Sequence, residues 1–254
     1  MKLFPESIPF LNGSRFDDDY CLKLISTDDP ADRGTIDRIS LLERLVGDKK
    51  IVHVGCVDHS AALIERESAR GTWLHGRLSG VAHQCVGIDI NDEGILYLKK
   101  TLGVEDVFCC DLTCEALPLA ADQPFDFLLL GEILEHVDNP VGFLTTLRQK
   151  HFPHGVRSMI VTVPNALRER NYRDSRNDQE RINSDHRYWF SPFSIAKVLT
   201  EAGYEIDDIY LVRHKPLKNP GTRGFKSWNR RRLQKKHPFL RDTIVVTATV
   251  RNIR

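Results

Sequence analysis

The sequence predicts an α/β fold, with a mostly parallel seven-stranded sheet, helices on both faces and an antiparallel strand at one edge. Short apolar segments that suit strands alternate with longer segments of helical periodicity over most of the chain. The segment at 125–130 is an almost continuous apolar run, which is typical of a strand covered on both faces. This alternation favours parallel strands, because helices usually make the crossover between them.

The chain is expected to begin with an arm and to continue as one domain. Residues 1–34 contain three prolines and read as an irregular arm packed on the domain. Residues 35–254 are expected to form a single domain with a basic insertion at 213–241. Strands are predicted at 51–56, 85–89, 107–110, 125–130, 159–163, 204–212 and 243–250. Helices are predicted at 35–47, 61–79 with a break at Gly71, 92–102, from 140 onward, and 192–201.

Local signals support several of these boundaries. Gly103 is expected to end the helix at 92–102, and Asn139 followed by Pro140 to begin the next one. The polar stretch 165–190 is predicted as a loop. The last two strands are expected to pair as a late hairpin, which gives the sheet its antiparallel edge.

Composition indicates a globular protein without a strong charge preference. Apolar residues make up 41% of the chain, charged residues 28%, and the formal net charge is +1. The insertion at 213–241 nevertheless contains eleven lysines and arginines and no acidic residue. The six cysteines form no C-x-x-C pair, so reduced thiols are expected. The first twenty residues do not resemble a signal peptide, and no apolar run approaches a membrane span, so we expect a cytoplasmic protein.

Glycine and carboxylates lie at the ends of four predicted strands. Gly55 follows the first strand, Asp89 ends the second, Asp111 follows the third, and Gly131 with Glu132 follows the fourth. Ligands of open parallel sheets bind beyond the carboxyl ends of the strands. We therefore expect one binding site along this edge.

The order of these features, together with two downstream motifs, resembles a known enzyme family. Residues 132–140 read EILEHVDNP, and residues 185–192 read DHRYWFSP. With the preceding strand ends, they are similar to the class I S-adenosylmethionine-dependent methyltransferases over roughly residues 35–250. The resemblance implies a Rossmann-like fold and S-adenosylmethionine as cofactor.

The same resemblance implies which residues bind the cofactor. Asp89 would accept hydrogen bonds from both ribose hydroxyls, because an ionised carboxylate only accepts. Asp111 would lie near the adenine, and Gly131 where the fourth strand meets the cofactor. The turn after the first strand would approach the amino-acid end of the cofactor. The full implied set is Gly55, Cys56, Val57, Asp58, His59, Ser60, Asp89, Ile90, Asp111, Leu112 and Gly131.

The first turn departs from the family pattern. Most members carry an acid followed by three alternating glycines, and here the corresponding residues are His53, Gly55, Val57 and His59. Only the first glycine is retained. The cofactor has no phosphate, so such a turn is tolerable. Side chains at 58–60 are expected to contribute contacts that glycines leave to the backbone, and GTWLHGRLSG at 71–80 is expected to be a local insertion.

A second set of residues is predicted to carry the chemistry. Glu132, Glu135, His136 and His186 resemble the divalent-metal ligands of two O-methyltransferase groups, which act on the terminal ribose of small RNAs and on catechol-like precursors. Mg²⁺ or Mn²⁺ is the expected ion, bound to a vicinal diol of the acceptor. Glu135, His136 and His186 are the expected catalytic residues. Without a metal, either histidine would act as general base.

The acceptor is left open by the sequence. Relatives with the ending P-F-L-x-D-T-I-V, here residues 238–245, favour a small molecule or glycan, with O-methylation of a sugar hydroxyl. The alternatives are an RNA ribose 2′-O-methyltransferase and a binding protein that has lost turnover. The basic insertion is read either as a solvated surface or as a contact for an anionic acceptor, a peripheral membrane surface or nucleic acid.

Overall fold

The computed structural model describes residues 1–57, 60–118, 124–214 and 225–251. Its centre is a seven-stranded sheet in the order β5-β4-β3-β6-β7-β9-β8. The strands are β3 (Lys50–Val54), β4 (Gln84–Asp89), β5 (Val107–Cys109), β6 (Phe125–Gly131), β7 (Val156–Pro164), β8 (Tyr204–Val212) and β9 (Thr243–Val250). The longer helices are α2 (Arg38–Val46), α3 (Ala61–Ala69), α4 (Leu74–Ser79), α5 (Asp92–Leu102), α6 (Pro140–Gly155), α7 (Glu169–Ser175), α8 (Pro192–Glu201) and α9 (Phe225–Lys236).

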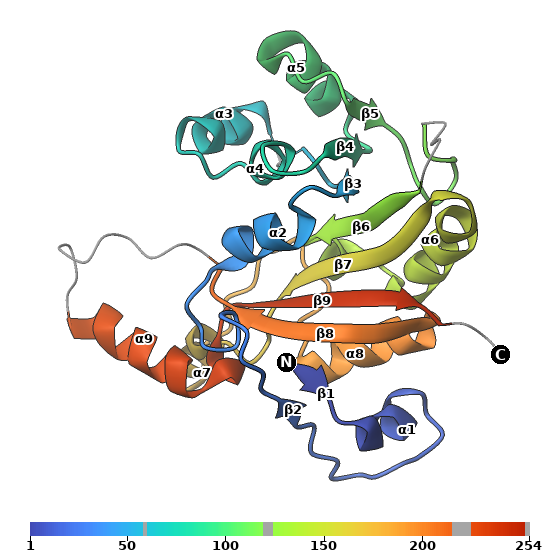
Figure 1. The fold of residues 1–254 in the computed structure, drawn as a ribbon. Coiled ribbons are helices and arrows are strands. Elements are labelled where there is room, and N and C mark those ends of the chain that lie inside the picture. Colours follow the sequence, from blue (N-terminus) through green and yellow to red (C-terminus); the bar gives the residue numbers. More distant parts are fainter. Residues whose placement is uncertain (58–59, 119–123, 215–224, 252–254) are drawn as a thin grey trace.

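The predicted fold class is confirmed. Strands β5, β4, β3, β6 and β7 pair in parallel, and β9 pairs antiparallel with both β7 and β8. At one edge of the sheet, β8 is the outermost strand and runs in the same direction as β7 (Figure 1). The antiparallel strand β9 lies between β7 and β8. The late hairpin β8–β9 is the predicted antiparallel pair.

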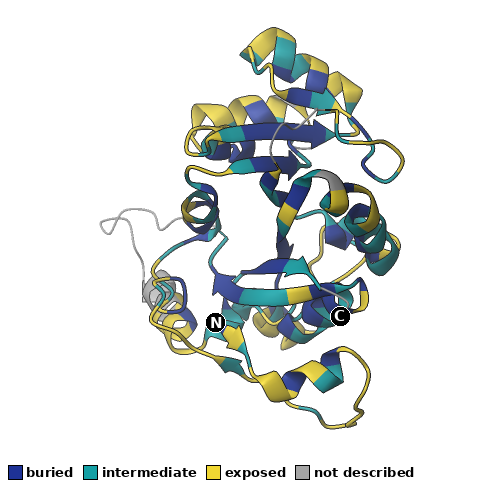
Figure 2. Cartoon of the chain, turned by 45° about the vertical axis from the view of Figure 1, so that its right-hand side comes forward, coloured by how far each residue is buried: buried dark blue, intermediate teal, exposed yellow. Residues whose placement is uncertain are grey.

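Both faces of the sheet are covered, as the apolar run in β6 predicts. Leu128 and Leu130 belong to the core that α6 and α8 cover, and Leu129 belongs to the core that α2 and α4 cover. All three leucines are fully buried. The central strands are accordingly almost entirely buried (Figure 2). Helices on opposite faces therefore hold the strand ends in fixed positions.

Local sequence signals set several element boundaries. The predicted helix at 61–79 is divided into α3 and α4 by Gly71, whose φ is 63°. Asn91 caps the start of helix α5, where its side chain accepts a hydrogen bond from Gly94 N, and the left-handed Gly103 caps its end. Ser191 begins α8 with a capping box.

Two of the longer helices were not predicted, nor was the short helix α1 (Ile8–Leu11) in the arm. Helix α7 lies within the polar stretch 165–190, which was read as a loop, and α9 lies within the basic insertion. Both segments have few apolar residues, so neither shows the apolar periodicity from which a helix is recognised. Residues 215–224 of the insertion lie outside the described part of the chain. Within the described ranges, no helix is both long enough and apolar enough to cross a membrane.

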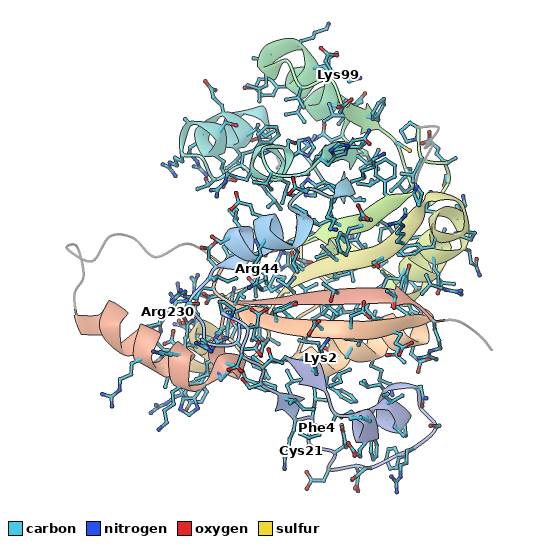
Figure 3. The ribbon with its side chains drawn as sticks, viewed as in Figure 1. Lys2, Phe4, Cys21, Arg44, Lys99 and Arg230 are labelled. Carbon is cyan, nitrogen blue, oxygen red and sulfur yellow. The ribbon has the colours of Figure 1, made fainter. Side chains whose placement is uncertain are left out.

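The arm at 1–34 packs against the β8 edge of the sheet. It contains a short antiparallel pair, β1 (Lys2–Leu3) with β2 (Leu24–Ile25), and the short helix α1 (Ile8–Leu11). The backbone N–H of Ile209 in β8 donates to Met1 O at 3.0 Å, and Lys2 Nζ lies 2.7 Å from Asp208 Oδ2 (Figure 3).

One buried arginine, just before β9, joins the arm to β8 and α9. Arg241 is fully buried, and its guanidinium donates to the carbonyls of Ala31 and Asp32 in the arm, Leu211 in β8 and Gln234 in α9, at 2.7–3.0 Å. Burial lowers the pKa of Arg241 to about 10, while the charge of Asp32 acts in the opposite direction. The four carbonyls satisfy this buried cation, as its burial requires.

Candidate active site

A cleft of about 1420 Å³ lies beyond the carboxyl ends of the central strands. Most of the predicted site residues line it: Gly55, Cys56, Val57, Asp89, Ile90, Asp111, Leu112, Gly131, Glu132, Glu135, His136 and His186. Ser60 is not among the lining residues; its hydroxyl accepts a hydrogen bond from Leu63 N at the start of α3. Asp58 and His59 lie outside the described residues.

The turn after β3 requires its one glycine. Gly55 has a φ of 76°, and a Cβ there would lie 2.4 Å from Ile133 Cδ1. Val57 replaces the family's second glycine, and a Cβ on Gly94 of α5 would lie 2.3 Å from Val57 Cγ1. The larger side chain in the turn is therefore accommodated by a glycine in α5, a pairing that sequence analysis did not identify.

Backbone groups fix the two strand-end aspartates. Asp89 Oδ2 accepts from Val57 N at 2.9 Å, and Asp89 Oδ1 accepts from Asn91 N at 3.0 Å. Asp111 Oδ1 accepts from the hydroxyl and the backbone N–H of Thr113, and these bonds lower the pKa of Asp111. Both residues line the cleft, where a carboxylate can accept from hydroxyl or amino groups. This arrangement fits the ribose and adenine of S-adenosylmethionine.

Three of the four predicted metal ligands converge. Single ligand atoms of Glu135, His136 and His186 all lie within 4.8 Å of one another. Glu135 and His136 belong to the 3₁₀ turn η2 (Leu134–His136), and His186 lies in the loop before α8. That loop is tied to the turn because Arg187 N donates to Glu135 O at 2.7 Å. We call these three side chains the Glu-His-His cluster.

The Glu-His-His cluster contains polar atoms without protein partners. Glu135 is fully buried, and neither of its carboxylate oxygens has a hydrogen-bond partner among the described residues; the same is true of His186 Nδ1. Burial raises the pKa of Glu135 to about 8, and the negative charge of Glu132 adds to this. Partial burial and the neighbouring His136 lower the pKa of His186. Two imidazoles and a carboxylate that lacks a partner form a donor set that a divalent cation fits.

Asp185 orients one of the histidines. Its Oδ2 lies 2.8 Å from His136 Nδ1, and the rings of His136 and His186 meet edge to face with centroids 4.6 Å apart. Metal-binding histidines commonly use their second nitrogen in such a carboxylate contact. Asp185 belongs to the DHRYWFSP motif, in which sequence analysis assigned it no function.

Glu132 is not joined to the cluster. Its Oε1 lies 3.2 Å from Arg38 Nη1 and 3.3 Å from His214 Nδ1. Partial burial would raise the pKa of Glu132, but Arg38 and His214 outweigh this and lower it to about 2. Glu132 also has a left-handed backbone, with φ of 61°, which is unusual outside glycine. The fourth predicted ligand, Glu132, therefore contacts Arg38 and His214 at the cleft wall.

Sequence analysis missed a second pair of histidines at the cleft. His53 on β3 and His75 on α4 both line it, and their Nδ1 atoms lie 3.2 Å apart. His53 was noted only as a departure from the family pattern, and His75 only as part of the insertion at 71–80. A side chain in β3 and one in a separate helix could not be paired from local sequence.

The described part of the basic insertion contributes to the cleft through paired charges. Arg230 on α9 lies 2.6 Å from Asp242 Oδ1 and 3.5 Å from Glu169 Oε2 of α7 (Figure 3). Arg168 stacks its guanidinium over Trp189 at 4.6 Å. Both arginines line the cleft, as does Arg213. The cleft lining therefore includes several guanidinium groups.

Comparisons with known proteins agree with this fold. A family model described as a methyltransferase domain matches residues 35–209. No curated protein sequence matches the chain. Among solved structures, the chain resembles a methyltransferase in complex with the Haloferax volcanii Trm112 activator, at TM-score 0.53 and 14% identity, covering 84% of this chain and 88% of that one. It also resembles a Thermotoga maritima S-adenosylmethionine-dependent methyltransferase, at TM-score 0.51 and 16% identity, covering 84% and 87%.

The small RNA methyltransferase HEN1 is a further structural neighbour, at TM-score 0.51 and 14% identity. The match covers 85% of this chain but only 25% of that one, so it concerns one domain of a longer protein. At these identities the structural likeness establishes the fold. The family model spans more than half of the chain, and the protein therefore belongs to the methyltransferase-domain family and is an S-adenosylmethionine-dependent methyltransferase.

Proposed function

We propose that the protein methylates a hydroxyl group of a sugar, a glycan or a related small molecule, with a divalent cation held by Glu135, His136 and His186. The observation that carries the proposal is the Glu-His-His cluster, whose buried carboxylate lacks a hydrogen-bond partner among the described residues. A buried carboxylate is costly unless a cation or hydrogen bonds compensate it. A cation at this position offsets that cost.

The Glu-His-His cluster is proposed to hold the metal, and neighbouring residues hold the cluster in place. A bound Mg²⁺ or Mn²⁺ would supply Lewis-acid activation of an acceptor hydroxyl, lowering its pKa. Asp185 holds His136 in orientation. Arg187 ties the loop that carries His186 to the turn that carries Glu135. Glu132 stays with Arg38 and His214, so the proposal assigns it to the cleft wall instead of the metal.

The acceptor is proposed to carry a negative charge as well as a vicinal diol. Arg168 and Arg213 line the cleft, and Arg230, which also lines it, is held in ion pairs with Glu169 and Asp242. Arginine is well suited to bind phosphate or carboxylate through its planar fork of N–H donors. A sugar phosphate or nucleotide sugar combines both features.

Transfer of a labelled methyl group tests the proposal. The purified protein would be freed of metal, resupplied with Mg²⁺ or Mn²⁺, and offered nucleotide sugars, sugar phosphates and a short RNA with a 3′-terminal diol. We expect metal-dependent label on a sugar acceptor and none on the same acceptor lacking one hydroxyl of the diol. Label on the RNA alone would favour the ribose methyltransferase instead, and full activity in chelator would refute the metal.

Matched histidine variants separate a metal ligand from a general effect. His186→Asn removes a ligand, whereas His83→Asn changes an exposed histidine just before β4, at the opposite end of that strand from the cleft. We expect the first variant to lose turnover and Mn²⁺ binding, and the second to retain both. The cluster also counts against a binding protein that has lost turnover, because such a protein has no need for polar groups beyond the donor site.

A further inference from the structure

The buried pair His53 and His75 has no role in the chemistry described above. The two side chains are 2% and 1% exposed, and their rings are nearly parallel, with an interplanar angle of 12°. Their Nδ1 atoms lie 3.2 Å apart. The Nε2 atom of each is buried and has no hydrogen-bond partner among the described residues. Leaving two such atoms unsatisfied costs stability, so a partner is expected at both.

The contact between the two rings fixes what the Nε2 atoms offer. Burial lowers the pKa of both histidines, to about 4 for His75, and the neighbouring charge of Arg38 acts further on His53. Both imidazoles are therefore neutral, and a hydrogen bond between the Nδ1 atoms needs one proton shared between them. The ring that donates this proton has a bare Nε2, which accepts, and the other ring has an Nε2–H, which donates. Whichever ring donates, the pair presents one acceptor and one donor.

The order of the strands places this pair between the ribose site and the Glu-His-His cluster. Asp111 follows β5, Asp89 ends β4, His53 lies on β3, and Glu135 follows β6, in the spatial order of the sheet. A donor with its ribose at Asp89 and its sulfonium directed toward the cluster has its amino-acid part beside β3. Gly131 keeps this approach open, because a Cβ there would lie 3.3 Å from His53 Nε2.

We propose that His53 and His75 together bind the amino-acid end of S-adenosylmethionine. The bare Nε2 accepts from the ammonium group, and the Nε2–H of the partner ring donates to the carboxylate. An uncharged pair of this kind takes the place of the acid that the family pattern has at position 53. The proposal rests on S-adenosylmethionine being the methyl donor. It does not depend on the proposed metal or on the identity of the acceptor.

Two ligands that differ only in the amino-acid part test the proposal by calorimetry. S-adenosylhomocysteine carries that part, and 5′-methylthioadenosine keeps the adenine, ribose and sulfur without it. Asparagine approximates the Nδ1 position of histidine and removes Nε2, whereas glutamine keeps a polar group at the Nε2 position. We expect His53→Asn and His75→Asn each to weaken S-adenosylhomocysteine binding by about tenfold or more, since hydrogen bonds to charged groups are lost. Binding of 5′-methylthioadenosine should stay within about twofold, because no such bond is lost there.

His53→Gln should retain more affinity for S-adenosylhomocysteine than His53→Asn, and His83→Asn should match the wild type. Binding of 5′-methylthioadenosine reports an intact cleft in each variant. The wild-type protein gives an independent reading by ¹⁵N NMR: S-adenosylhomocysteine, but not 5′-methylthioadenosine, should shift the Nε2 resonances of two histidines. Equal losses for both ligands, or no loss for either, would overturn the proposal, as would Nε2 resonances that respond to both ligands alike.

Discussion

The cleft contains two pairs of histidines whose neighbours differ. His53 and His75 are fully buried, lie nearly parallel and contact each other through Nδ1. His136 and His186 are partly exposed, meet edge to face, and lie beside the carboxylates of Asp185 and Glu135. Histidine side chains thus occur in two settings in this cleft, one pair beside each other and the other pair beside carboxylates.

The difference shows how neighbours decide the chemistry of an imidazole. Without a carboxylate partner in the described structure, the first pair stays neutral and serves as a hydrogen-bonding unit. Beside two carboxylates, the second pair offers nitrogen ligands around a negative charge, which suits a cation. Substitutions in the first pair should therefore leave metal binding unchanged, and substitutions in the second pair should leave donor binding unchanged. The following experiments test that separation.

Removing the acid of the Glu-His-His cluster is expected to have the largest effect. Glu135→Gln keeps the shape of the side chain but removes its charge, so turnover should fall on the order of a thousandfold, the loss of several kcal/mol that a bound metal supplies. Binding of S-adenosylhomocysteine should not change, because Asp89 and the first histidine pair remain. Single-turnover label transfer and calorimetry measure the two quantities. A parallel loss of donor affinity would show that the two halves of the cleft are not separate.

Acid should destabilise the protein through the first pair. The folded-state pKa of His75 is about 4, below its ordinary value of 6.5. The unfolded chain therefore binds a proton that the folded protein does not, and the free energy of unfolding falls as the pH drops from 6.5 to 4. The shift corresponds to about 3 kcal/mol. Urea unfolding at stepped pH should show a shallower loss in His75→Asn, and identical pH profiles would contradict the neutral pair.

A smaller effect is expected from the residue that orients His136. Asp185→Asn should weaken Mn²⁺ binding by about 10- to 100-fold, the usual cost of losing such a carboxylate. Asp178→Asn, an exposed change before the same loop, is the matched control. Titration with Mn²⁺ compares the two variants. Equal affinities would show that Asp185 does not hold the ring.

The ribose contact can be tested on the donor side. Asp89→Ala should reduce donor affinity by about tenfold, because hydrogen bonds to a charged group are lost. The variant also removes the acceptor for Val57 N. Mn²⁺ binding at the cluster should persist. An unchanged affinity for S-adenosylhomocysteine in a folded variant would exclude Asp89 from the ribose site.

The smallest effect concerns Arg230. Its ion pairs with Glu169 and Asp242 join α9 to α7 and to the start of β9. Partly exposed pairs contribute little, so Arg230→Ala should lower the free energy of unfolding by about 1 kcal/mol or less, with less change at high salt. Denaturant unfolding at two salt concentrations measures this. A clear loss of acceptor binding without any loss of stability would assign the side chain to the acceptor.

The sequence predicted those parts of the site that depend on strand ends. Asp89 and Asp111 line one cleft because the carboxyl ends of parallel strands share an edge, and Glu135 with His136 lies in the turn that follows β6. These placements need only the order of strands and helices. Burial of β6 on both faces was also predictable, because its continuous apolar run needs no information from distant segments.

The remaining features depend on contacts between distant segments. Glu132 was grouped with the metal ligands by its spacing, but its left-handed backbone is accompanied by contacts with Arg38 and His214. His75 became a partner of His53 only through the packing of α4 on the sheet. The periodicity of apolar residues in the sequence does not reveal such pairings, because each is set by tertiary packing.

The buried Arg241 has a consequence for the order of events during synthesis. The carbonyls of Ala31 and Asp32 are made before the guanidinium that satisfies them, which follows 210 residues after Ala31 and 209 after Asp32. Since the N-terminal part of a chain emerges first, the arm has to wait for the last strand before it can dock. A nascent chain stalled before residue 241 should therefore expose the arm to protease, and release of the last segment should protect it.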